Sequence, residues 1–251
     1  QITRKSLKVL DFHIPPLHIQ TQIVAELDEL NAILDKKKKQ LEELDILAQA
    51  TFYDMFGDPV LNDKGWEKIK LENLGQWASG GTPSRKINSY FRGDIPWVIS
   101  GELNTPYIYE TNEHITNEAI SNSNAKLIPV GSLLLGMYDT AALKSSITLV
   151  EMSCNQAIAY AKLDDQLCDT IYVYHSIQIN KEEYKKQQRG IRQKNLNLSM
   201  IKSISILYPP LSLQHQFAER IEAIEAQKEL INQSIKEVQL LFDYTMDKYF
   251  N

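Results

Sequence analysis

One phrase of sequence occurs twice in this chain, and Pro15 recurs as Pro209 at an offset of 194 positions. The first copy reads IPPLHIQTQIVAEL and the second reads YPPLSLQHQFAERI. The match begins at Ile2 and Leu196 and continues to Phe56 and Phe250. Because the period has the size of a domain, the pattern indicates a duplicated module and not a solenoid of short stacked units.

Each copy predicts one long helix after a pair of prolines. Residues 18–56 contain neither Gly nor Pro, and their apolar residues recur at heptad spacing, as they do after Pro210. A helix of ~39 residues, at about 1.5 Å each, spans roughly 58 Å, which is too long for the core of a small domain. We therefore expect two antiparallel helices that act as a spacer. The expected seam residues are Ile23, Leu27, Leu30, Leu34, Leu41, Leu44, Ile221, Ile224, Ile231, Ile235 and Val238.

Lysines interrupt this heptad pattern. Lys37 and Lys228 fall at seam positions, where a polar residue can fix register and orientation. The alternative is that each side chain simply extends its charge to solvent from a loose seam. The run DKKKKQ at 35–40 is expected to be a solvated outer face of the helix and not a nucleic-acid site.

The segment between the helices, 58–208, has the pattern of a separate mixed α/β domain. Its boundary is the turn-rich GDPVLNDKGW at 57–66. Short helices are expected near 117–123, 181–190 and 199–203. Strands in a largely antiparallel sheet are expected at IPWVIS, LIPVGSLLLGMY, SITLV, AIAYAKL and TIYVYHSIQI.

Charge is distributed unevenly, although the chain as a whole has a net charge of −5. Residues 58–208 hold 16 Lys and Arg against 16 Asp and Glu, so the repeated segments hold the other 11 basic and 16 acidic residues. Within the neutral segment, 181–202 carries seven basic residues against Glu182 and Glu183. A local basic patch is therefore compatible with an acidic chain.

Composition places the protein in the cytoplasm. No apolar run approaches the ~20 residues of a membrane helix, and no secretory leader opens the chain. Cys154 and Cys168 fit no metal or redox spacing and are expected to be reduced, buried thiols. Since the chain begins with Gln1 and not Met, we expect a processed or excised product.

No catalytic motif stands out, and polar recognition is the better interpretation. There is no Gly-rich cofactor loop after a strand, and the five histidines show no ligand spacing. SGGTPSRK at 79–86 suits phosphate contact, since its glycines would let backbone amides approach closely. RGIRQKNLN at 189–197 combines side chains that pair with base edges or phosphates. The alternative for both is an ordinary solvated loop.

Exposed polar residues at expected strand ends complete the candidate DNA-binding set. Phosphate or guanine contacts are expected from Arg85, Lys86, Arg189, Arg192 and Lys194. Base or shape reading is expected from Ser84, Glu102, Asn104, Tyr138, Gln193 and Asn195. The set is Ser84, Arg85, Lys86, Glu102, Asn104, Tyr138, Lys144, Arg189, Arg192, Gln193, Lys194 and Asn195.

These motifs resemble one family. The stretches GWEKIKLENLG, GGTPS and YFRGDIPWVISGEL, followed by GIRQKNLNLSMIKSISILYPPLSLQHQFAERI and a long helix, are similar to the DNA-specificity (S) subunits of type I restriction-modification systems. The resemblance implies target-recognition domains alternating with antiparallel spacer helices, so that each domain reads half of a split DNA target. It also implies a non-catalytic chain that acts with methyltransferase (M) subunits, which carry S-adenosylmethionine, and with restriction (R) subunits.

On this resemblance, residues 1–14 are the tail of an absent upstream recognition domain. A spacer helix (15–57), a target-recognition domain (58–208) and a second spacer helix (209–251) follow. The chain is then the distal half of a specificity subunit or a half-sized form, which either acts alone on one half-site or pairs with a second copy through its helices. The alternatives are a coiled-coil protein-interaction scaffold and a recognition module of a fused restriction-methylation enzyme.

Overall fold

The computed structural model describes residues 14–138, 143–188 and 196–250, with the side chains of 185–188 excepted. The chain divides into two compact units. The helical unit comprises Gln1–Leu47 and Ile224–Asn251, and the α/β unit comprises Ala48–Ala223. The division falls inside the two long helices, whereas the boundaries expected from sequence lie at the helix ends.

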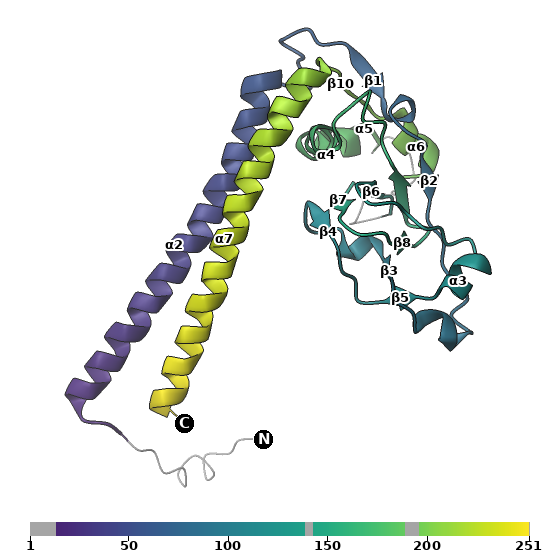
Figure 1. Cartoon of the computed structure of the whole chain (residues 1–251). Helices are drawn as coiled ribbons and strands as arrows, with labels where there is room; N and C mark the ends of the chain where they lie inside the picture. The colour runs from purple at the N-terminus through teal and green to yellow at the C-terminus, as the bar shows by residue number, and fades with distance from the viewer. Residues whose placement is uncertain (1–13, 139–142, 189–195, 251) are drawn as a thin grey trace. The chain divides into compact units, whose positions relative to one another are not determined.

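The helical unit contains most of two 40-residue helices, α2 (Leu17–Phe56) and α7 (Leu211–Phe250). They run side by side (Figure 1). The Lys228 ammonium lies 2.8 Å from the Asp45 carboxylate, and the Tyr249 hydroxyl lies 3.1 Å from that of Glu26. The later residue of α7 thus contacts the earlier residue of α2. The expected antiparallel pair is confirmed.

The heptad positions define the buried stripe of this pair. Ile23, Leu30 and Leu34 on α2 and Ile224 on α7 are buried, as is Ile221 in the α/β unit. The other seam residues are half-buried, and they are Leu27, Leu41, Leu44, Ile231, Ile235 and Val238. This is the burial that a two-helix seam produces, with the residues between the seam positions left to solvent.

The lysines follow the same logic. Lys36, Lys38 and Lys39 are exposed, which confirms a solvated face, while Lys37 at its seam position is half-buried. Lys228 is only 17% exposed, and it contacts Asp45 across the pair and Glu225 on its own helix, both at 2.8 Å. The position holds an ion pair between the helices and is not a loosely extended side chain.

The repeated Pro-Pro-Leu-x-x-Gln phrase has one structural role in both copies. The side-chain amide of Gln20 donates to the carbonyl of Pro15 at 2.8 Å, and that of Gln214 donates to the carbonyl of Pro209, also at 2.8 Å. Proline fixes φ and cannot continue a preceding regular element, so the helix begins at a defined place. The glutamine then ties the turn before the helix to its first turn.

The residue that follows the last residue of α2 has to be glycine. Gly57 has φ +77, the left-handed conformation common just after a helix. Its N–H donates to the Tyr53 carbonyl at 2.8 Å. A Cβ at this position would lie 2.2 Å from Asp63 Oδ1, so any other residue would displace that carboxylate.

The α/β unit contains three small sheets. The largest has the order β2-β9-β6-β7-β4 and is antiparallel except for β4 with β7. A second has the order β5-β3-β8, with β3 and β8 parallel, and β1 pairs with β10 antiparallel. The strands are β1 (Lys68–Lys70), β2 (Ala78–Ser79), β3 (Ile95–Val98), β4 (Tyr107–Ile108), β5 (His114–Ile115), β6 (Leu133–Gly136), β7 (Ser145–Thr148), β8 (Ser153–Cys154), β9 (Ile158–Ala161) and β10 (Ser205–Leu207).

Short helices connect these strands. The expected helices are confirmed as α3 (Asn117–Ser121), α5 (Lys181–Gln188) and α6 (Leu198–Ser203), and single 3₁₀ turns form η1 (Leu71–Asn73), η2 (Asn88–Phe91) and η3 (Ser100–Glu102). The mixed α/β class with a largely antiparallel sheet is therefore confirmed.

The segment TIYVYHSIQI was expected to be a strand, and that prediction is wrong. It forms the helix α4 (Thr170–Ile179). Asp169 caps it, because its Oδ1 accepts the N–H of Ile171 at 2.8 Å and of Tyr172 at 3.3 Å. β-Branched and aromatic residues suggested a strand, but the buried positions 172, 173, 174, 176 and 177 do not alternate as they would along a half-buried strand.

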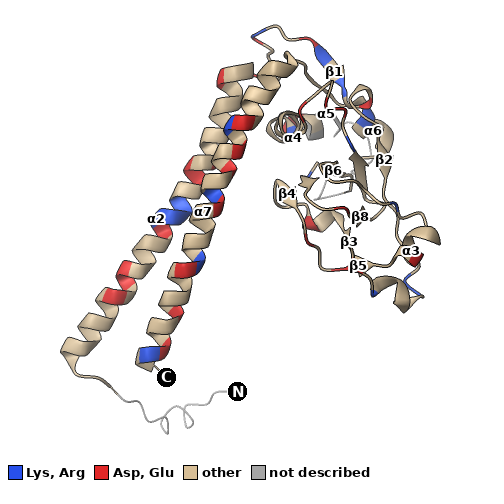
Figure 2. Cartoon of the chain, in the orientation of Figure 1, with Lys and Arg blue, Asp and Glu red and all other residues tan. Residues whose placement is uncertain are grey.

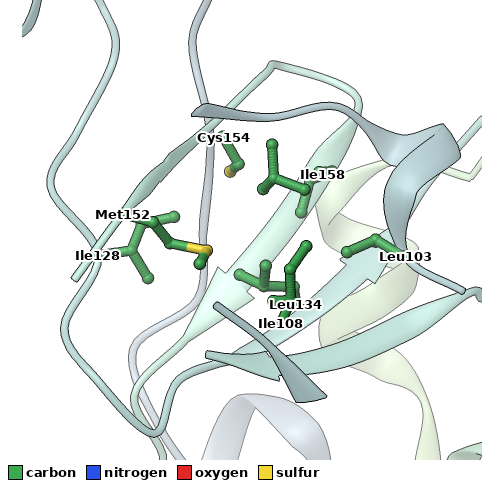
Figure 3. Packing of buried hydrophobic residues seen from close by; sticks show 8 residues of the cluster. Leu103, Ile108, Ile128, Leu134, Met152, Cys154 and Ile158 are labelled. Atoms are coloured by element: carbon green, nitrogen blue, oxygen red, sulfur yellow. The ribbon is translucent and has the colours of Figure 1, made fainter. Parts of the chain in front are cut away.

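Three clusters of apolar side chains form the core of this unit. Figure 3 shows the first, in which Leu134 of β6, Ile158 of β9 and Met152 converge. A second cluster surrounds Trp97, which is 2% exposed. In the third, the rings of Phe52, Phe56, Tyr172 and Phe217 lie with centroids 4.8 to 6.3 Å apart.

Candidate nucleic-acid interface

Two residues expected to touch DNA meet at one end of the large sheet. The ammonium of Lys144, which precedes β7, lies 2.7 Å from Asn104 Oδ1. Asn104 follows η3, and its amide donates to the Gly101 carbonyl at 2.7 Å. Residues 40 positions apart in the sequence are thus joined at the surface.

Glu102 extends this group of polar contacts. Its Oε2 accepts the Ile99 N–H at 2.9 Å, which closes the η3 turn. Its Oε1 accepts both the backbone N–H and the side-chain amide of Asn112 at 2.8 Å. Both carboxylate oxygens are therefore engaged within the unit, and they fix η3 against the segment that precedes β5.

Arg85 contacts the residue after Asn112, which is Glu113. Its guanidinium forms two parallel hydrogen bonds with the Glu113 carboxylate, at 2.5 and 2.6 Å. The cation also lies 4.3 Å from the ring centroid of Phe91 and 5.2 Å from that of Trp97. The hydrogen bond to Arg85 lowers the pKa of Glu113, and the same bond raises the pKa of Arg85. Both groups are therefore charged at neutral pH.

Four of the predicted residues, Arg85, Glu102, Asn104 and Lys144, thus belong to a polar network. It runs from Lys144 through Asn104 and Glu102 to Asn112, and the following residue, Glu113, holds Arg85. Sequence reasoning missed Asn112 and Glu113. Only their place between two expected strands marked them, and no local motif shows which residues they contact.

The other predicted residues divide into two groups. Ser84 and Lys86 are exposed on the loop that carries Arg85, and Tyr138, just after β6, is 40% exposed. Five more lie outside the described residues, namely Arg189, Arg192, Gln193, Lys194 and Asn195.

The glycines of SGGTPSRK have a different role from the expected one. The N–H of Gly80 donates to the Ile158 carbonyl at 3.0 Å, and that of Gly81 donates to the Cys154 carbonyl at 2.9 Å. A Cβ at either glycine would lie within 2.3 Å of backbone atoms. The two amides are thus used within the fold, and these glycines allow close packing instead of an approach to phosphate.

A cavity of about 180 Å³ lies beside Lys144. Leu103 lines it together with a set of polar side chains, none of which is a carboxylate. The polar set is Asn104, Lys144, Ser145, Tyr174, Gln178 and Lys181. Sequence reasoning missed four of these residues, namely Ser145, Tyr174, Gln178 and Lys181. Tyr174 and Gln178 lie in the helix that was mistaken for a strand.

Positive and negative side chains are mixed along the two long helices, unlike the lining of this cavity. Figure 2 shows Lys and Arg interspersed with Asp and Glu along α2 and α7. Such mixed charge is typical of a solvated helix surface and gives no single-sign field.

Other chemistry finds little support in the described ranges. Among those residues, no three His, Cys, Asp or Glu side chains are placed to hold a metal ion. Both cysteines are buried, and burial raises the pKa of the Cys154 thiol strongly and that of Cys168 to about 12. Neither thiol has the lowered pKa of a reactive cysteine. Within residues 14–250, where described, no helix has the length and apolar character needed to cross a membrane.

The structure is thus a mixed α/β domain enclosed in sequence by two long, paired helices, with a polar network on the surface of the domain. The family comparison identifies the class of protein. The chain belongs to the family described as the type I restriction modification DNA specificity domain, whose model matches residues 63–240.

Relatives of known name share this description. The chain is 26% identical over 254 residues to the EcoR124I/EcoR124II specificity subunit of Escherichia coli. The alignment covers 94% of this chain and 60% of that protein. It is 26% identical over 192 residues to the MjaIX specificity subunit of Methanocaldococcus jannaschii. This alignment covers 75% of this chain and 44% of that protein.

Solved structures show the same fold. The S subunit from M. genitalium matches with a TM-score of 0.67 at 10% identity, over 94% of this chain and 61% of that one. The HsdS subunit from Thermoanaerobacter tengcongensis matches with a TM-score of 0.58 at 15% identity, over 94% and 59%. The chain thus spans about 60% of the length of these S subunits.

Proposed function

We propose that the protein recognises a specific DNA sequence as the specificity subunit of a type I restriction-modification complex. The observation that carries this proposal is the family match over residues 63–240, which includes nearly all of the α/β unit. The α/β unit reads one half of a split target, and the paired helices set the distance to the other half. The chain itself performs no reaction.

We assign different roles to the predicted residues, and the contacts of the network support some of these roles. Lys86 and Lys144 contact phosphates, while Ser84, Asn104 and Tyr138 read bases or groove shape. Glu102 positions η3 for this reading, since both of its oxygens are already engaged. Arg85 is held by Glu113 and acts through its remaining N–H groups. The basic segment from Arg189 to Asn195 adds further phosphate and base contacts.

Partners supply the chemistry in this proposal. Methyltransferase subunits that carry S-adenosylmethionine dock on the chain and modify adenine, restriction subunits join them, and the complex acts in the cytoplasm. A neutral recognition segment neutralises few phosphates by itself, so tight DNA binding requires the methyltransferase subunits. The chain alone is therefore expected to bind duplex DNA weakly.

Selection from a random duplex library tests this function. The complex of the chain with its methyltransferase subunits should enrich one sequence motif, and the chain alone should enrich none at the same protein concentration. If the chain captures methyltransferase subunits but the complex enriches no motif, the coiled-coil scaffold is the better account. If the chain alone methylates or cleaves DNA, the non-catalytic role is wrong.

A second copy of the chain provides the other half of the recognition surface. Near one end of the helical unit, Val24, Met246 and Phe250 are 57%, 36% and 63% exposed. At an offset of 194 these residues correspond to Ala218, Phe52 and Phe56, which are buried in the α/β unit. An α/β unit from a second copy is a fitting partner for this surface, because its own repeat buries the same positions.

Light scattering at micromolar concentration tests the pairing. A dimer of the 28.8 kDa chain is expected, and Phe250→Ala should shift it toward the monomer. Leu240→Ala is the matched control, since Leu240 and its counterpart Ile46 are both exposed, at 72% and 65%. If wild type shows only the monomer, or if the control dissociates as readily as Phe250→Ala, pairing through this surface is wrong.

A further inference from the structure

The cavity beside Lys144 is built from separate parts of the α/β unit. Asn104 follows η3, Lys144 and Ser145 lie at the start of β7, and Gln178 lies near the end of α4. Lys181, the first residue of α5, contributes a second cation to the lining. Tertiary folding therefore brings two cationic side chains to one small cavity.

The chemistry of the lining selects a small anion. An ammonium group has three donors and no acceptor, and Asn104 uses only one of the three on Lys144. Ser145, which is 4% exposed, accepts from Gln178 and keeps its own O–H proton for another acceptor. Among the residues that the structure describes, none that lines the cavity is a carboxylate, and Glu182 and Glu183 of α5 are not part of that lining.

The volume of the cavity limits the size of the ligand that it can hold. At ~30 Å³ for each water molecule, a cavity of 180 Å³ holds about six. Pockets for drug-sized ligands measure about 300–1,000 Å³, so this cavity is suited to a single compact group. A tetrahedral oxyanion satisfies both the charge and the size.

The backbone beside the cavity is held in an unusual conformation. Leu143 is fully buried and has φ +58, which a non-glycine residue rarely adopts. Its N–H donates to the Gly136 carbonyl at 2.8 Å, and its carbonyl accepts the side-chain amide of Gln178 at 2.9 Å. Strained residues persist only where their surroundings hold them, and they concentrate at functional sites.

We propose that this cavity binds one phosphate group of the DNA backbone, with Lys144 and Lys181 as its cations and Ser145 as a donor. The inference rests on the proposed DNA-recognition function and adds a specific anchoring point to it. A phosphate held there fixes the register of the duplex beside Asn104. It carries no sequence information itself.

Inorganic phosphate is the first probe. In the isotope-labelled full chain, phosphate should shift the NMR signals of the Gln178 side-chain amide and of the Ser145 backbone amide. Lys144→Gln should weaken this phosphate binding at least tenfold. Lys68→Gln is the matched control, because it removes the same charge from an exposed position on β1. Thermal unfolding of each variant shows whether it is folded.

The salt dependence of duplex binding by the complex with methyltransferase subunits is the second probe. Each phosphate contact contributes a slope of about −0.9 in log K against log salt. Lys144→Gln and Lys181→Gln should each reduce the slope by about 1 without changing the preferred sequence, and Lys68→Gln should leave it unchanged.

The outcomes separate this inference from the proposed function. If phosphate shifts no cavity signal and the salt slope is unchanged, the phosphate site is wrong, while a retained sequence preference leaves DNA recognition intact. If phosphate binds but the slope is unchanged, the cavity serves a free anion and the DNA backbone is not its ligand. If the complex binds no DNA at all, the proposed function fails, and the assignment of the DNA backbone as ligand fails with it.

Discussion

The two copies of the repeat share their local structure and differ in their surroundings. Gln20 and Gln214 each donate to a proline carbonyl at 2.8 Å, but only Gln214 also accepts the Asp169 N–H, at 3.0 Å. Phe56 is fully buried, whereas its counterpart Phe250 is 63% exposed.

This difference separates two kinds of information in the repeat. The prolines, the glutamine and the heptad residues encode a helix start and a seam, and these form in both copies without further help. The aromatic residues and the glutamine oxygen encode attachment of an α/β unit. In this chain the unit is held by the end of the first copy, through Phe52 and Phe56, and by the start of the second copy, through Gln214 and Phe217. The counterparts of Phe52 and Phe56, which are Met246 and Phe250 at the end of the second copy, are exposed in the described structure, as is Val24 near the start of the first copy.

The largest expected effect compares the two phenylalanines directly. Phe56→Ala should lower the free energy of unfolding by about 3–5 kcal/mol, because it leaves a cavity among Phe52, Tyr172 and Phe217. Phe250→Ala, measured on the monomer by urea denaturation, should change it by less than about 0.5 kcal/mol. Equal losses in the two variants would show that the copies have the same environment.

The glutamines come next. Gln214→Ala should cost about 1–3 kcal/mol, because it removes a fully buried side chain and leaves the Asp169 N–H and the Pro209 carbonyl without their partner. Gln20→Ala loses one bond at a half-buried position and should cost about 0.5–1 kcal/mol. Chemical denaturation of both variants checks the order, and a larger loss at Gln20 would contradict the stronger attachment at Gln214.

A third prediction concerns one seam position that the copies fill differently. Leu34 is apolar and 6% exposed, whereas its counterpart Lys228 bonds to Asp45 and Glu225. Burial lowers the pKa of Lys228, but the hydrogen bonds that it donates to these two carboxylates outweigh burial and raise the pKa overall.

Lys228→Ala should therefore cost about 1–2 kcal/mol, since two carboxylates lose a charged partner. Lys228→Met, which keeps the volume, should cost less and can even stabilise the pair. Circular dichroism of thermal unfolding measures both variants. An alanine variant as stable as wild type would mean that the ion pair contributes nothing to the seam.

The smallest effect belongs to the surface network, which has no counterpart in either repeated helix. Glu113→Gln should cost at most about 1 kcal/mol at pH 7, because its partner Arg85 is largely exposed. The pKa of Glu113 is lowered in the folded state, so the stabilisation is present above its unfolded pKa of about 4.3 and is lost as the pH falls below that value. Unfolding curves of wild type and variant should converge as the pH falls through the lowered folded-state pKa of Glu113, and a constant difference would contradict this.

Periodic features were predictable from sequence, and tertiary pairings were not. The heptads of α2 and α7 extend over 40 residues each, and this length outweighs local ambiguity. Thr170–Ile179 was misread because its β-branched residues favour a strand, while the Asp169 cap and packing against Phe217 favour a helix. Lys144 and Asn104 were recognisable as polar residues at strand ends. The contacts of Glu113 and Gln178 depend on residues 28 to 35 positions away, which no local pattern specifies.

Mapping of methylated adenines in a genome tests the central claim most directly. Cells would carry this chain and its methyltransferase subunits as the only such system. The account predicts methylation at an inverted repeat whose halves are separated by a fixed spacer, because two copies of one α/β unit read the two halves. Methylation at an uninterrupted target, or at two unrelated half-sites, would contradict a paired module with one recognition domain in each copy.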